Sequence, residues 1–152
     1  MDDLDQSAHL NKVIVAGVET TARDLPVLGE KVLDRLNLKM GLQLEKSIIK
    51  GAKRLGANDQ ALAPIELTLI SEAAAVEILR NRKMLKGSRV FVNEALTRER
   101  QEVFKLARNR FENKNVWTMR GIIFVKNGSQ IIPCKTIADV AQILNLANEP
   151  SL

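Results

Sequence analysis

Side chains that could carry out catalysis are few in this sequence. It contains one histidine, His9, and one cysteine, Cys134. No group of His, Cys, Asp and Glu residues has the spacing of metal ligands, and no glycine cluster leads from a strand into a helix as in phosphate-binding loops. Because covalent and acid–base catalysis need a positioned nucleophile or base, we expect a protein without enzymatic activity, metal or cofactor.

Positive charge is concentrated in one part of the chain. Residues 80–126 contain 13 Lys and Arg against 4 Asp and Glu, a net charge of +9, whereas the whole chain carries +5. Residues 1–30 have a net charge of −4. A local excess of this size is typical of a surface that binds nucleic-acid phosphates or an acidic partner. The alternative is a set of solvated helix faces.

We expect phosphate neutralisation by this basic segment, with limited reading of bases. The candidate phosphate contacts are Arg80, Arg82, Lys83, Arg98, Lys105, Arg108, Arg110 and Arg120. Arg98 and Arg108 are the strongest of them, since they share one helix face. About half of the set could instead pair with glutamates at helical spacing.

Three further residues could contact nucleic acid. Lys53 and Arg54 form a dibasic pair beside Gly51 and could bind a backbone phosphate, although a solvated sheet edge would look the same. Trp117 could stack on a base, but its place beside Val116 on a short strand favours packing.

The first part of the chain predicts an α+β domain with the order β-α-β-β-α-β. Strands are expected at 12–18, 47–55, 65–70 and 89–93, and helices at 25–40 and 72–85, with Asp24 and Ser71 as N-caps. Residues 56–64 are rich in Gly, Asn, Asp and Pro and predict a loop. This order is that of ferredoxin-like and RNA-recognition-motif domains, so we expect such a domain over residues 10–92.

The second part predicts a small helix-hairpin-helix α+β domain over residues 93–146. Thr97 should cap a basic helix that ends near Asn113. Strands are expected at 116–119, 122–126 and 130–134, the last two joined at Asn127-Gly128, followed by a helix at 137–144 capped by Thr136. Both ends of the chain are expected to be poorly ordered.

Residues 89–144 carry a recognisable pattern. It consists of a hydrophobic-Asn-Glu strand, then Leu-Thr, a basic helix, a Val-Trp strand and a Gly-hydrophobic-Phe-Val-Lys strand, and it is formed by Val92, Asn93, Glu94, Leu96, Thr97, Leu106, Ala107, Arg108, Val116, Trp117, Gly121, Ile122, Phe124, Val125 and Lys126. It resembles the C-terminal domain shared by the baculovirus few-polyhedra protein and the first-open-reading-frame proteins of insect LINE-type retrotransposons. The preceding domain is similar, more loosely, to the RNA-recognition motif of those retrotransposon proteins.

The resemblance implies binding of single-stranded RNA or DNA, and chaperone-like activity within a ribonucleoprotein. The retrotransposon relatives oligomerise through an N-terminal coiled coil, and no heptad run precedes Asn11. The chain is therefore either a fragment or assembles differently.

The first predicted sheet departs from an RNA-binding pattern. The family usually places Arg or Lys around the third strand, where this chain has Glu66, Glu72 and Glu77, and strands 12–18 and 65–70 have no stacking aromatic residue. The competing hypothesis is therefore a viral or domesticated retrotransposon-derived module, whose uncharged first sheet binds a second copy or a protein partner. The lone cysteine and the lack of a membrane-length apolar run predict an intracellular protein, nuclear or cytoplasmic, without membrane partners.

Overall fold

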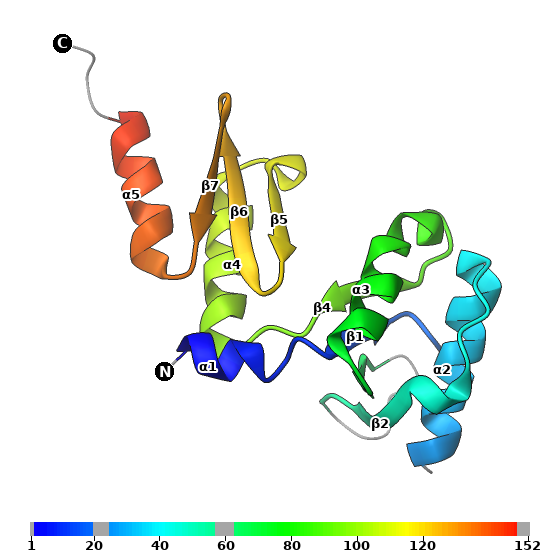
Figure 1. Ribbon diagram of the computed structural model, residues 1–152. Coiled ribbons are helices and arrows are strands. Elements are labelled where there is room, and N and C mark those ends of the chain that lie inside the picture. Colours follow the sequence, from blue (N-terminus) through cyan, green and yellow to red (C-terminus); the bar gives the residue numbers. More distant parts are fainter. Residues whose placement is uncertain (1, 20–24, 57–62, 149–152) are drawn as a thin grey trace. The chain divides into compact units, whose positions relative to one another are not determined.

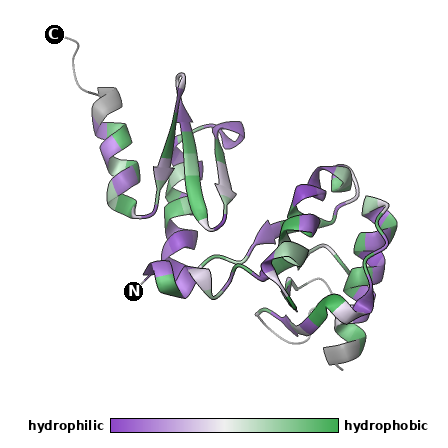
Figure 2. Ribbon diagram, in the orientation of Figure 1, coloured by the Kyte–Doolittle hydropathy of each residue, from purple (hydrophilic) through white to green (hydrophobic). Residues whose placement is uncertain are grey.

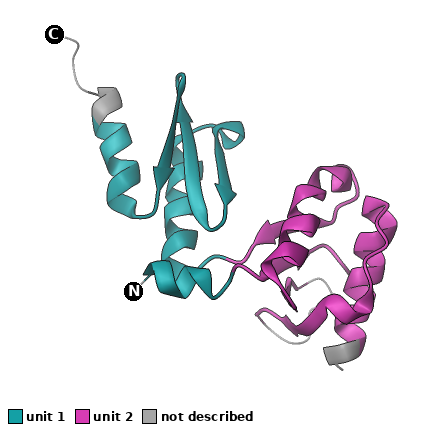
Figure 3. Ribbon diagram, in the orientation of Figure 1, with its two compact units in different colours: residues 1–9, 96–152 teal, residues 10–95 magenta. Residues whose placement is uncertain are grey.

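The computed structural model describes residues 2–19, 25–56 and 63–148, which fall into two compact units (Figure 3). Unit 2 is Leu10–Ala95, and unit 1 combines residues 96–148 with residues 2–9. The boundary lies three residues after the predicted one. Both units are α+β, in agreement with the predicted class.

Unit 2 holds a four-stranded antiparallel sheet and two helices (Figure 1). Its elements are β1 (Lys12–Ala16), α2 (Leu25–Met40), the 3-10 helix η1 (Lys46–Ile48), β2 (Ile49–Arg54), β3 (Ile65–Leu69), α3 (Glu72–Arg80), the 3-10 helix η2 (Arg82–Leu85) and β4 (Phe91–Glu94). The strand order is β2-β3-β1-β4, and all three pairings are antiparallel. The segment from residue 47 to 55 does form a strand, with an irregular register between Ile49 and Gly51. Asp24 and residues 57–62 of the predicted loop lie outside the described residues.

One face of this sheet and both helices enclose the core of unit 2. Alternate residues of the central strands are buried, for example Val13 and Val15 of β1 and Leu67 of β3. They join Leu36 of α2 and Ile78 of α3 in one cluster. The period of two in the strands therefore sends the branched apolar side chains toward the helices.

The opposite face of the sheet corrects one prediction. Lys12, Glu66 and Lys53 alternate with the buried residues, and the Lys53 and Glu66 side chains form an ion pair of 3.4 Å. This face therefore carries charged side chains, so the expectation of an uncharged sheet was wrong, although Ile14 and the exposed Phe91 lie on the same face. The run VIVAGV looks continuous in sequence, but Val13 and Val15 point inward and Ile14 lies on the outer face.

Helix α3 is shorter than predicted. Ser71 caps it as expected, since its Oγ accepts a hydrogen bond of 3.1 Å from the Ala74 N–H. The α-helix ends at Arg80 because the Asn81 side chain donates back to the Glu77 carbonyl at 2.8 Å. The following residues form η2 and not a further α-helical turn.

Unit 1 packs two helices on one face of a three-stranded sheet. Its elements are α1 (Asp2–Ser7), α4 (Arg98–Arg110), the 3-10 helix η3 (Asn113–Asn115), β5 (Val116–Met119), β6 (Ile122–Asn127), β7 (Gln130–Cys134) and α5 (Ile137–Asn148). The strand order is β5-β6-β7, and both pairings are antiparallel. Val103 and Ala107 of α4 meet Val125 and Val140 in the core. In Figure 1, α4 lies behind the three strands.

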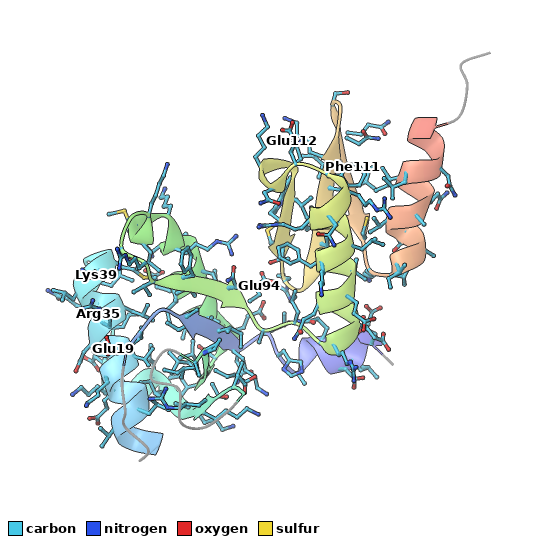
Figure 4. The ribbon with its side chains drawn as sticks, turned by 180° about the vertical axis from the view of Figure 1, so that it is seen from behind. Glu19, Arg35, Lys39, Glu94, Phe111 and Glu112 are labelled. Atoms are coloured by element: carbon cyan, nitrogen blue, oxygen red, sulfur yellow. The ribbon has the colours of Figure 1, made fainter. Side chains whose placement is uncertain are left out.

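The capping predictions for unit 1 are confirmed. Thr97 accepts from the Arg100 N–H at 3.2 Å, and Thr136 accepts from the Asp139 N–H at 3.2 Å. Helix α4 ends at Arg110, earlier than predicted, because Phe111 turns extended and packs against the core (Figure 4).

The N-terminal residues correct another prediction. Residues 2–7 form helix α1, which belongs to unit 1, whereas a poorly ordered tail was expected. The Gln6 side chain is buried and lies against Gly121, where a Cβ atom would overlap it. Arg120 and Gly121 both have positive φ, 52° and 78°, as the two-residue turn between β5 and β6 requires.

Candidate nucleic-acid interface

The structure divides the predicted basic segment between the two units. Arg80, Arg82 and Lys83 belong to unit 2, whereas Arg98 to Arg120 belong to unit 1. The eight predicted phosphate contacts therefore come from two separately folded surfaces, and each surface is considered by itself.

In unit 2 the cations lie on a turn between α3 and β4, residues 80–89, which we name the basic turn. The buried Leu85 anchors η2 in the core. Lys83 and Lys86 are both exposed, and the Lys86 N–H donates to the Lys83 carbonyl at 3.3 Å where η2 ends. Ser88 closes the turn with a hydrogen bond of 2.6 Å from its Oγ to the Leu85 carbonyl.

The basic turn carries positive charge that nearby carboxylates do not neutralise. The sequence has no Asp or Glu between Glu77 and Glu94. The Arg80 guanidinium forms an ion pair of 2.5 Å with the Glu77 carboxylate of the same helix. The other four cations form no ion pair within the described residues: Arg82, Lys83, Lys86 and Arg89. Four uncompensated cations on eight residues make a strong local phosphate site.

Backbone geometry fixes the end of the basic turn. Arg89 has a φ of 67°, a conformation that costs a side-chain-bearing residue roughly 1–2 kcal/mol. Its carbonyl oxygen lies so close to Gly17 that a Cβ atom there would overlap it. The Arg89 side chain nevertheless stays exposed, so the strain holds a cation at the surface.

One exposed aromatic ring follows the basic turn. Phe91 of β4 is 62% exposed and lies opposite Ala16, on the sheet face away from the helices. Sequence reasoning missed Phe91 together with Lys86 and Arg89. The signals were present: an acid-free basic run, and an alternation in which Val90 and Val92 are buried and Phe91 is not.

The dibasic pair Lys53 and Arg54 does not form an open phosphate site. Lys53 pairs with Glu66 across the sheet, and Arg54 is half-buried in β2.

In unit 1 the predicted cations of α4 have different surroundings. The Arg98 side chain is 94% exposed, with a single marginal contact of 4.0 Å to Glu102. Lys105 and Arg110 are exposed. The Arg108 guanidinium lies over the Phe104 ring, 4.6 Å from its centroid, so Arg108 covers the helix surface and Arg98 projects into solvent.

Trp117 and Arg120 lie on and beside the sheet of unit 1. The Trp117 ring stacks on Phe124 of the neighbouring strand, with centroids 6.0 Å apart and planes at 17°. Both rings lie on the side opposite the buried Val116 and Val125. Arg120 occupies the turn at the end of β5.

This outer face of the sheet is apolar and slightly basic. Met119 and Ile131 are 56% and 57% exposed, and Lys126 lies on the same side as Phe124. The sequence has no Asp or Glu from residue 113 to 138. Figure 2 shows the hydrophobic colouring of β6 on this sheet. A ring pair in an acid-free setting suits contact with bases.

Arg100 is a cation that the sequence did not single out. It lies between Arg98 and Lys105 on α4, yet its side chain is only 2% exposed. Its guanidinium bonds to Asp2, to Asp3 at 2.6 Å and to the Gly121 carbonyl at 2.7 Å. Arg100 is therefore removed from the open surface of the helix.

The ion pair between Asp2 and Arg100 makes the stability of unit 1 depend on pH. Burial opposes ionisation of Asp2, but hydrogen bonds from Thr97 and Arg100 and the positive charge of Arg100 outweigh burial and lower the pKa of Asp2 below its ordinary 3.8. A lowered folded-state pKa stabilises unit 1 above about pH 4, and this stabilisation is lost as the pH falls through the lowered value.

We therefore expect the protection factors of the α1 amides, that is, their exchange rates relative to an unstructured peptide at the same pH, to fall below about pH 4, and Asp2→Asn to flatten this dependence. The pKa of Asp139 is also lowered, chiefly by the Lys135 N–H, so Asp139→Asn serves as the control. It should change the acid response of α5 and leave that of α1 intact. Protection factors in α1 that do not change with pH in the parent protein would contradict the assignment.

The remaining reactive groups offer little chemistry. Burial, aided by the charge of Asp139, raises the pKa of Cys134 to about 11, so its thiol is a poor nucleophile at neutral pH. Within the described residues no three His, Cys, Asp or Glu side chains gather as metal ligands. None of the described helices is both long and apolar enough to cross a membrane.

Comparison with known proteins leaves these surfaces as the only guide to function. No protein-family model matches the chain, and no curated protein matches it either.

Proposed function

We propose that this protein binds single-stranded RNA or DNA without catalysing a reaction, and that the basic turn makes the main phosphate contacts. The supporting observation is that Arg82, Lys83, Lys86 and Arg89 have no ion pair in the described chain, while Arg80 is paired. Phosphates would neutralise these cations, with release of counterions from the nucleic acid.

Bases would stack on aromatic rings of these surfaces. In unit 2 the ring is the exposed Phe91, two residues after Arg89. In unit 1 it is the half-buried Trp117–Phe124 pair, on the sheet face away from α4. Arg98 and Lys105 of α4 would be separate phosphate contacts on the helix side of that sheet. Stacking accepts any base, so sequence preference should be weak.

We also infer that unit 2 is a ferredoxin-like domain of the RNA-recognition-motif kind. The β-α-β-β-α-β order, and a sheet with β1 and β3 at its centre and both helices contributing to one core, support this assignment. The relationship to the few-polyhedra and retrotransposon proteins remains part of the same proposal.

Protein docking through the first sheet has less support. Its outer face holds Lys12 and the Lys53–Glu66 pair, and Ile14 is half-buried there. Phe91 is the one large apolar side chain strongly exposed on the described strands of this face, and a single exposed ring among charged residues needs no partner to cover it. The acid-free basic turn has no comparable internal partner within the described residues, which favours nucleic acid.

The Arg89→Gly substitution should separate stability from binding. Glycine adopts positive φ without strain, so the variant should be at least as stable as the parent in urea. It loses one phosphate contact, which should weaken binding to a 20-nucleotide single strand about fivefold in 0.1 M salt. Fluorescence anisotropy measures the affinity. Arg89→Asn is the control, because Asn tolerates the conformation without the charge, and it should weaken binding by the same factor. Unchanged affinity in both variants would remove Arg89 from the interface.

A further inference from the structure

Helix α1 holds its acidic side chains against cations of unit 1. Asp2 accepts from the Arg100 Nε and, at 2.8 Å, from the Thr97 hydroxyl. Asp3 accepts from the Arg100 Nη2 at 2.6 Å, and the Lys135 Nζ lies 3.4 Å from it. Two carboxylates of one short helix thus lie against donors from Thr97, Arg100 and Lys135.

These donors form a built anion site. The Arg100 side chain is 98% covered, and its Nη1 is fixed on the Gly121 carbonyl, so the Nε and Nη2 edge stays directed at the carboxylates. The Thr97 backbone N–H donates to the Gln6 side chain at 2.9 Å. A guanidinium edge, a hydroxyl and an ammonium group are also the donors that recognise a phosphate group.

The contacts that hold α1 are polar rather than apolar. The helix has six residues, and Gln6 is the one buried side chain among them. Its large apolar residue, Leu4, is 71% exposed. A helix of this length is marginal by itself and depends on these contacts. The Asp3 and Lys135 side chains are exposed, so this part of the attachment is open to competing anions, whereas the Asp2–Arg100 pair is largely buried. Helix α1 is therefore suited to being displaced by an anion.

We propose that α1 masks a phosphate-binding site formed by Arg100, Thr97 and Lys135, and that nucleic-acid phosphates displace Asp2 and Asp3 from it. This inference rests on the proposed function. It adds a second phosphate-binding site and names α1 as the segment that blocks it. The chain's own carboxylates occupy the place of the phosphate oxygens, and the acidic N-terminal segment competes with the nucleic acid for the same donors.

The affinity test combines three variants of the full chain with a 20-nucleotide single-stranded RNA. Asp2→Asn with Asp3→Asn should bind about fivefold more tightly in 0.1 M salt, because one more phosphate contact becomes available. Asp5→Asn is the control for loss of one charge, against two in the double variant, since Asp5 is exposed on the same helix and bonds to none of these cations; it should change affinity less than about twofold. Arg100→Met in the double-Asn background should abolish the gain. A gain that survives Arg100→Met, or appears equally in Asp5→Asn, would overturn the masked site.

A folding readout accompanies the affinity test. The His9 amide donates to the Gln6 carbonyl at 2.9 Å and reports the end of α1, whereas the amides of Val103 and Val125 report the core. The double-Asn variant should lose protection from hydrogen exchange at His9 and keep it at Val103 and Val125. If the core amides also lose protection, affinity is read instead from competition in the parent protein.

That competition measures the His9 amide of the parent protein with RNA and, separately, with inorganic phosphate. Both should accelerate its exchange. If RNA binds while protection at His9 is unchanged, the masked site is wrong and the proposed function stands. If phosphate displaces α1 and RNA does not bind, the site stands and the proposed function fails. If neither ligand acts on the protein, both are wrong.

Discussion

The double substitution Lys83→Glu with Lys86→Glu should weaken binding to single-stranded nucleic acid by at least about 20-fold in 0.1 M salt. Both side chains are exposed on the basic turn, without a carboxylate partner in the described chain. Each reversal removes a phosphate contact, worth about fivefold for single strands at this salt, and adds repulsion. The slope of log affinity against log salt should also become shallower by about 1.4, which is 0.7 for each lost contact. Anisotropy titrations at several salt concentrations measure both.

The matched control for this variant is Lys31→Glu with Arg35→Glu on α2 of the same unit. These residues are exposed, and the net charge changes equally, but α2 interleaves its cations with Glu30 and Asp34. Figure 4 labels Arg35 and Lys39 on this helix. The control should weaken binding less than about threefold, because only the long-range field changes. Equal loss in both variants would mean that net charge, and not the basic turn, determines affinity.

Gly17→Ala should be the most destabilising small substitution in unit 2, by about 3 kcal/mol or more. The residue has a φ of 85°, which is strained for alanine, and the new Cβ would overlap the backbone carbonyl of Arg89. A backbone atom cannot turn aside as a flexible side chain does. Relief of the clash requires movement of the basic turn, so binding should weaken together with stability. Urea unfolding followed by circular dichroism measures the loss.

Gly41→Ala is the control that separates strain from overlap. Gly41 has a similar φ of 69°, but a Cβ atom added there would meet no described atom within 4 Å. It should cost only the conformational term, about 1 kcal/mol, and leave binding unchanged. If the two substitutions cost the same, the close approach of Gly17 to Arg89 does not hold the basic turn in place.

Local patterns were sufficient to predict most of the secondary structure. Ser71, Thr97 and Thr136 cap the helices expected of them, because a capping side chain bonds to an N–H only three residues away. The hairpin between β6 and β7 also forms, although Asn127 pairs with Gln130, so that Gly128 and Ser129 make the turn. The end of α3 was misplaced because Arg82 to Leu85 have good helix propensity, and the Asn81 side chain stops the helix.

The candidate site was less predictable from sequence, because a count of charged residues does not show which cation forms an ion pair with which carboxylate. Arg100 and Asp2 are separated by 98 positions, so no local pattern links them, and an amphipathic reading of α4 cannot tell a buried arginine from its exposed neighbours. The same count merged cations that the fold assigns to two units. Arg108 and Lys53 were named as contacts, yet one covers Phe104 and the other pairs with Glu66.

The most direct test of the account is a salt-dependent titration of the intact chain with a fluorescent single-stranded RNA. Four contacts from Arg82, Lys83, Lys86 and Arg89 predict binding with a slope of log affinity against log salt of about −3. Further contacts from α4 or from an unmasked Arg100 would make it steeper. Absence of binding at low salt, or binding whose affinity does not change with salt, would contradict the claim that the basic turn receives nucleic-acid phosphates.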